Sequence, residues 1–62
     1  NQRLRTLAAA NYLGLAKTTM EKLRSTGDGP VYIKLGRAVV YDTDDLDRWL
    51  ESNRVTPPGH AK

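Results

Sequence analysis

The apolar positions in the first half of the chain predict two short helices that meet at a tight turn. The first helix is expected over about residues 7–13, where apolar side chains recur at the spacing of one helix face: Leu7, Ala10 and Leu13. Thr6 is the expected N-cap, because its hydroxyl can accept a hydrogen bond from a first-turn amide. Gly14 is expected to end this helix, since glycine readily adopts the left-handed backbone of a C-terminal cap.

The second helix is expected over about residues 17–25, with Met20 and Leu23 on its inner face and Thr19 beside them. Its outer face is polar and consists of Lys17, Thr18, Glu21, Lys22 and Ser25. Ala16 occupies the N-cap position, where serine or threonine would stabilise the helix by about 1 kcal/mol. Two helices joined by a three- to four-residue turn that contains glycine are typical of a helix-turn-helix unit.

A run of turn-forming residues over 25–30 ends the second helix, and a stretch rich in β-branched and aromatic residues follows it. This stretch, residues 31–41, predicts two short strands with a reversal near Gly36 and Arg37. The side chains expected on the inner face are Ile33, Leu35, Val39 and Tyr41. The side chains expected at or near the exposed tip are Lys34, Arg37 and Ala38.

A last helix is expected to begin at Asp42, whose carboxylate can cap the amide of Asp45. An apolar stripe along this helix should close the core: Leu46, Trp49 and Leu50. The predicted fold is mainly α with a small β-hairpin, namely a winged helix-turn-helix with a two-stranded wing and a closing helix. We expect one domain over residues 1–54 and a flexible C-terminal tail over residues 55–62.

Charge is distributed unevenly along the 62 residues, although the net charge is only +3. Residues 1–41 hold seven basic and two acidic side chains, whereas residues 42–53 hold five acidic side chains and one basic side chain. This asymmetry predicts one basic face suited to a polyanion and one acidic face turned elsewhere.

Several classes of function find no support in the sequence. The chain has no cysteine, which excludes disulfides and thiolate metal sites, and the acidic run at residues 42–47 lacks the glycine and distant glutamate of a calcium loop. Its one histidine, His60, lies in the tail, and no nucleophile with a base or phosphate loop can be assembled. No apolar run is long enough to cross a membrane. We therefore expect no enzyme, no cofactor, no metal and no membrane partner.

The candidate DNA contacts lie on the second helix and on the hairpin. Residues at the N-terminus of a recognition helix face the bases, and here these are Lys17 and Thr18, with Glu21 and Lys22 one turn later. Glu21 could accept from a cytosine or pair with Lys17. Lys34 and Arg37 flank the expected reversal, where they suit phosphate contacts or a narrow minor groove.

Three segments together resemble the AlpA/excisionase group of MerR-like winged helix-turn-helix domains. They are TLAAANYLGL (residues 6–15), GPVYIKLGRAVVY (residues 29–41) and DLDRWL (residues 45–50), and the similarity extends over about residues 4–54. Two departures from the family pattern are Ala16, where serine or threonine is usual, and Val40, where a basic residue is common. By this resemblance, the first-rank DNA contacts are Lys17, Thr18, Lys22, Lys34 and Arg37, with Arg24 and Tyr12 behind them.

The resemblance implies sequence-specific binding of double-stranded DNA in the bacterial cytoplasm, at the nucleoid. Its members are transcription regulators, or phage and mobile-element excisionases that bend attachment-site DNA and direct the integrase toward excision. The small size of the chain favours an excisionase, with an integrase as partner and cooperative self-association on DNA as an option. A small AlpA-like transcription regulator is the alternative. A second alternative is a protein-interaction module that uses the acidic last helix and Trp49.

Overall fold

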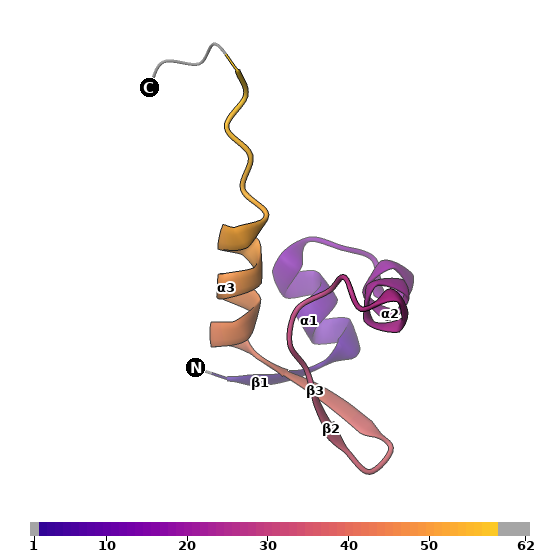
Figure 1. The fold of residues 1–62 in the computed structure, drawn as a ribbon. Helices are drawn as coiled ribbons and strands as arrows, with labels where there is room; N and C mark the ends of the chain where they lie inside the picture. The colour runs from indigo at the N-terminus through magenta and orange to yellow at the C-terminus, as the bar shows by residue number, and fades with distance from the viewer. Residues whose placement is uncertain (1, 59–62) are drawn as a thin grey trace.

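The computed structural model describes residues 2–58, which form three helices and a small antiparallel sheet (Figure 1). In chain order the elements are β1 (Arg3–Arg5), α1 (Thr6–Leu13), α2 (Lys17–Thr26), β2 (Ile33–Leu35), β3 (Ala38–Asp42) and α3 (Thr43–Ser52). Figure 1 shows α1 between α2 and α3, with the hairpin of β2 and β3 extending below them. The winged helix-turn-helix fold predicted from the sequence is confirmed.

The sheet has one strand more than the predicted two-stranded wing. β3 lies in the middle and pairs on one side with β2 and on the other with β1, so that Leu4 faces Tyr41 across the ladder. The amide of Thr43 and the carbonyl of Gln2 extend this pairing with a 2.9 Å hydrogen bond. The strand was missed because three residues with only one apolar side chain carry too short an alternation to identify.

Both helices of the helix-turn-helix end on a glycine with a left-handed backbone, as predicted for Gly14; for the second helix the prediction was a run of turn-forming residues over 25–30. Gly14 has φ of 77°, and the amide of Leu15 reaches back to the carbonyl of Ala10 at 2.8 Å. The same arrangement recurs at Gly27, which follows α2. These are Schellman caps, which satisfy carbonyls that a helix end would otherwise leave unpaired. The cap at Gly14 therefore fixes the direction in which the short turn leads from α1 to Ala16, the N-cap of α2.

The helix starts differ from the predictions in detail. Thr6 is not the N-cap of α1: the helix begins at Thr6, and the cap residue Arg5 makes no side-chain capping bond. Ala16 is the N-cap of α2 and likewise offers no such bond, as its methyl side chain requires. Asp42 does cap α3, but it accepts at 2.9 Å from the amide of Asp44, the second helical residue, rather than from that of Asp45, the third, and either amide suits an N-cap carboxylate.

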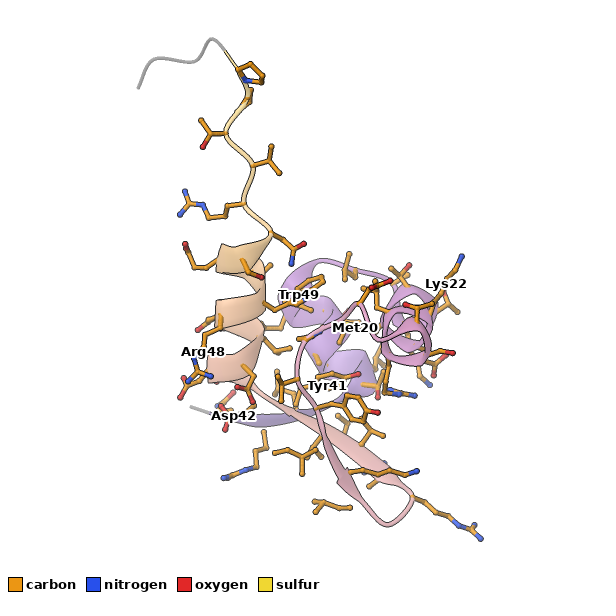
Figure 2. All side chains as sticks on the ribbon, in the orientation of Figure 1. Met20, Lys22, Tyr41, Asp42, Arg48 and Trp49 are labelled. Atoms are coloured by element: carbon orange, nitrogen blue, oxygen red, sulfur yellow. The ribbon has the colours of Figure 1, made fainter. Side chains whose placement is uncertain are left out.

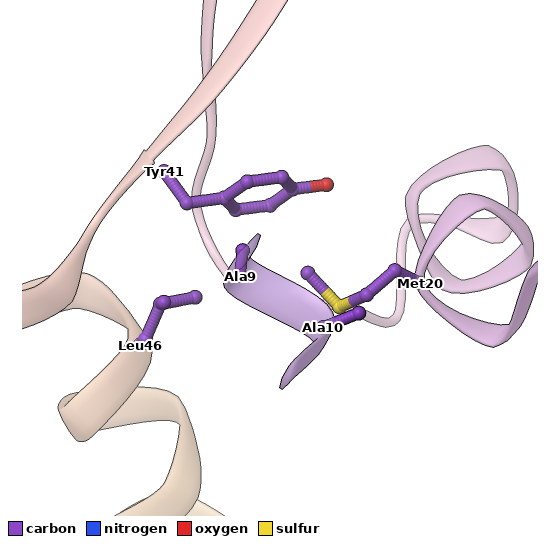
Figure 3. Packing of buried hydrophobic residues seen from close by; sticks show 5 residues of the cluster. All are labelled: Ala9, Ala10, Met20, Tyr41 and Leu46. Atoms are coloured by element: carbon purple, nitrogen blue, oxygen red, sulfur yellow. The ribbon is translucent and has the colours of Figure 1, made fainter. Parts of the chain in front are cut away.

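The core is small and is centred on α1. Figure 3 shows its five fully buried residues: Ala9, Ala10, Met20, Tyr41 and Leu46. The partly buried residues that pack around them are Leu4, Leu13, Leu15 and Val39. α1 contacts α2, α3 and the sheet, and two alanines let all three approach it closely. The core thus draws one large side chain from each surrounding element.

Three apolar residues and one polar residue lie elsewhere than predicted. Leu7 is 56% exposed, because the small side chains of α1 face the core and turn Leu7 outward. Leu35 is 59% exposed, since it sits beside the hairpin turn beyond the reach of the helices. Leu50 is 39% exposed and Thr19 is also exposed, because α3 and α2 each bury a narrower face than the periodicity suggests.

Candidate nucleic-acid interface

The outer face of α2 carries a row of exposed polar side chains. Lys17 and Thr18 occupy its first turn, and Glu21 and Lys22 follow on the next. In Figure 2 the Lys22 side chain points away from the body of the protein, on the side opposite α3. The Nζ of Lys17 lies 4.0 Å from a carboxylate oxygen of Glu21, with both side chains about half exposed. The ion pair proposed for these residues is present, and the cytosine contact of Glu21 stays a prediction.

The hairpin presents a second set of exposed side chains. Lys34 on β2 and Arg37 in the turn are both exposed, and Gly36 between them has φ of 60°. Ala38 lies near the tip as predicted, since it begins β3 directly after the turn and pairs with Leu35, but it is half-buried rather than exposed. Arg37 is therefore the basic residue nearest the reversal, with Lys34 one step down the strand.

An open groove runs between α2 and the hairpin. Its lining brings together residues that lie far apart in the sequence: Arg5, Thr6, Leu7, Lys17, Glu21, Arg24, Arg37 and Val39. Four of these side chains are cationic and that of Glu21 is anionic, while Leu7 and Val39 add apolar surface. A polyanion lying here would meet positive charge from β1, α2 and the hairpin together. Cationic side chains beside apolar ones suit the backbone of a DNA strand, where charged phosphates alternate with sugars.

Sequence reasoning missed Arg5 as a member of this groove. The residue lies in β1, where Leu4 faces the core and the two flanking arginines face solvent. Recognition of a strand over residues 3–5 would have placed Arg5 on the outer face opposite Leu4.

Two of the predicted DNA contacts, Tyr12 and Arg24, instead form hydrogen bonds with other residues of the protein. The Tyr12 hydroxyl donates to a carboxylate oxygen of Asp47 on α3 at 2.7 Å, and this hydrogen bond raises the pKa of Tyr12 above its usual range. Tyr12 is thus held toward α3 rather than toward the groove. The Arg24 guanidinium donates at 3.3 Å to both the Thr6 and the Tyr41 hydroxyls.

The acidic side chains gather on α3, on the far side of α1 from α2 (Figure 1). Two arginines form ion pairs with acidic residues three positions earlier: Arg48 with Asp45 at 2.7 Å, and Arg54, just after α3, with Glu51 at 3.1 Å. Trp49 donates its indole N–H to the carbonyl of Asp28 at 3.1 Å, which ties α3 to the loop after α2. The charge separation predicted from the sequence is present in the fold.

Within residues 2–58, no three acidic or histidine side chains are placed to hold a metal ion together. Within the same residues, every helix is too short and too polar to cross a membrane. His60 lies outside the described residues.

A comparison with protein families decides the assignment. The family model described as helix-turn-helix domain matches residues 4–54, most of the chain. The chain belongs to the helix-turn-helix domain family. No curated protein matches it. Within this family assignment, α1, the turn at residues 14–16 and α2 form the helix-turn-helix, and the β2–β3 hairpin forms the wing. A helix-turn-helix domain binds DNA, and the basic groove lies between its second helix and its wing.

Proposed function

We propose that this helix-turn-helix domain binds double-stranded DNA sequence-specifically, with α2 in the major groove and the wing along the adjacent backbone or minor groove. The observation that carries the proposal is the groove between those two elements, where Arg5, Lys17 and Arg37 contribute exposed positive charge. The N-terminal turn of α2 presents Lys17 and Thr18 as base or phosphate contacts, and the wing presents Lys34 and Arg37.

A salt titration tests this binding mode. If four to six phosphates are neutralised, the logarithm of the association constant should fall with the logarithm of salt concentration at a slope of about −4 to −5. The measurement is fluorescence anisotropy of a labelled duplex at several salt concentrations. A flat response contradicts the proposal, because binding through this groove releases counterions.

Within DNA-binding proteins, we propose a phage or mobile-element excisionase that works in the bacterial cytoplasm, at the nucleoid, without enzymatic activity of its own. The resemblance of the TLAAANYLGL, GPVYIKLGRAVVY and DLDRWL segments supports this choice. The wing adds a physical reason, since Leu35 is exposed beside Lys34 and near Arg37. Apolar side chains that enter a groove next to cations unstack base steps and bend the duplex.

The acidic α3 remains accessible when α2 and the wing face DNA, because α3 lies on the opposite side of α1 (Figure 1). We therefore assign to α3 the contact with an integrase or with a neighbouring copy on DNA. A small AlpA-like transcription regulator would use the same DNA-binding face without needing to bend its site.

DNA bending separates these two candidates. In a circular-permutation gel shift with an attachment-site fragment, an excisionase should give complexes whose mobility depends on the position of the site. Leu35→Ala should reduce the bend more than it reduces the affinity, whereas Val55→Ala, which changes an exposed residue in the segment after α3, should leave both unchanged. A single complex without a bend would favour the regulator.

A further inference from the structure

Arg24 links three elements through a single guanidinium group. The side chain extends from the last turn of α2, and its Nη1 donates to Thr6 Oγ1 and to Tyr41 Oη, both at 3.3 Å. The guanidinium carbon also lies 6.0 Å from the centre of the Tyr32 ring, within the range of a cation–π contact. These partners lie at the start of α1, in β3 and just before β2.

One partner of Arg24, Tyr41, is itself buried in the core. Tyr41 is 1% exposed, and Figure 3 shows its hydroxyl pointing from β3 toward α2. The rings of Tyr32 and Tyr41 also pack together, with centroids 6.2 Å apart. A buried tyrosine hydroxyl needs a hydrogen-bond partner, and Arg24 supplies a charged donor. The guanidinium therefore lies against a buried hydroxyl and an aromatic ring rather than extending into solvent.

The extensive packing of α2 is with α1, whereas the wing packs on α1 and α3 through β3. Met20 packs α2 against α1 by van der Waals contact. This contact does not fix the angle between α2 and the wing, so other contacts must set it. The bonds of Arg24 to Tyr41 and Tyr32 connect α2 to the base of the wing. DNA must contact α2 and the wing at the same time, so the angle between them decides whether both fit one duplex.

We propose that Arg24 is a positioning residue that fixes the recognition helix relative to the wing through Tyr41, Thr6 and Tyr32, instead of a contact to DNA phosphate. This inference rests on the proposed function and revises the expectation that Arg24 binds DNA directly. Loss of the linkage should weaken binding to the preferred sequence, where both elements must be in register. Binding to random duplex depends on charge and should be retained.

The test uses two duplexes and two variants of the full chain. The wild-type protein first selects its preferred duplex from a randomised pool, and a scrambled duplex of equal length serves as the non-specific probe. Tyr41→Phe removes the acceptor hydroxyl without changing charge, and Arg24→Met removes the donor. Tyr41→Phe should lower the ratio of specific to non-specific affinity by about three- to tenfold, the size expected for one lost hydrogen bond, and Arg24→Met, which removes two hydrogen bonds, should lower it at least as much. The salt slope of Arg24→Met on the scrambled duplex should equal that of wild type.

Tyr32→Phe is the matched control, because it keeps the ring that faces Arg24 and should keep the wild-type ratio. A slope for Arg24→Met that is shallower by about 0.9 identifies a phosphate contact and overturns the proposal. An equal loss of affinity for both duplexes overturns it as well, since a change in stability alone lowers both. Failure of the wild-type protein to select any sequence contradicts the proposed function instead.

Discussion

Replacing Lys17 and Lys22 with alanine is expected to weaken DNA binding by about tenfold to a hundredfold at 100 mM salt, and to make the salt slope shallower by about 1.8. Both side chains are exposed on the outer face of α2, and each is expected to neutralise one phosphate. Phosphate contacts carry no sequence information, so the loss should be similar on preferred and scrambled duplexes. Fluorescence anisotropy across a salt series measures both quantities.

The matched control is Arg48→Ala with Arg54→Ala, which removes the same amount of charge from the other side of the molecule. Figure 2 shows Arg48 on α3, away from Lys22 on α2, and both arginines are paired with acidic neighbours. This variant should keep the wild-type slope. If the lysine variant also binds as wild type does, DNA does not lie on α2, and the protein-interaction alternative based on α3 gains support.

Replacing Leu46 with alanine is expected to cost about 2–5 kcal/mol of unfolding free energy. Leu46 is fully buried and is the only member of the five-residue core that α3 contributes. A domain of this size has a total stability of only about 3–5 kcal/mol, so the variant should be largely unfolded at 25 °C. Circular dichroism during urea or thermal denaturation measures the change.

Leu50→Ala on the same helix controls for this substitution. Leu50 is 39% exposed, and the smaller area that it buries should limit the cost to about 1 kcal/mol. Equal destabilisation by the two variants would show that α3 does not close the core through Leu46.

The elements that carry strong local signals were predictable from the sequence. A glycine with a left-handed backbone ends a helix, and α1 and α2 end directly before Gly14 and Gly27. Asp42 caps the last helix, which begins at Thr43, because a carboxylate next to free amides is stabilising wherever the rest of the chain lies. Such features depend on a few neighbouring residues, and these can be read directly.

The features that depend on distant partners were not predictable in the same way. Thr6 has the chemistry of an N-cap, but its hydroxyl accepts from Arg24, which is eighteen residues away in the sequence. Tyr12 has the chemistry of a phosphate ligand, but Asp47 lies within hydrogen-bonding distance. The sequence allows each hydroxyl more than one hydrogen-bond partner. The packing of α1 against its neighbours determines which partner it binds.

The candidate site shows the same division. The exposure of Lys17, Lys22, Lys34 and Arg37 was predictable because charge on an expected outer face requires no partner, and their contact with DNA stays a prediction. Arg5 was missed because its place in the groove depends on β1, whose pairing with β3 joins residues nearly forty positions apart. Arg24 was assigned to DNA through the family resemblance, while its tyrosine partners became evident only in the fold.

The concentration of the core around Ala9 and Ala10 has an evolutionary consequence. Among the described residues, the exposed positions of α2 and the wing tip contribute none of the five buried core side chains. Substitutions at Thr18 or Glu21, which are candidates for base contacts, can therefore change which DNA is recognised, and substitutions at Lys17, Lys22 or Arg37 can change the affinity, while the scaffold remains intact. A descendant of this chain could acquire a new target through substitutions at these positions, whereas a larger side chain in place of either alanine would disturb the packing of the elements around α1.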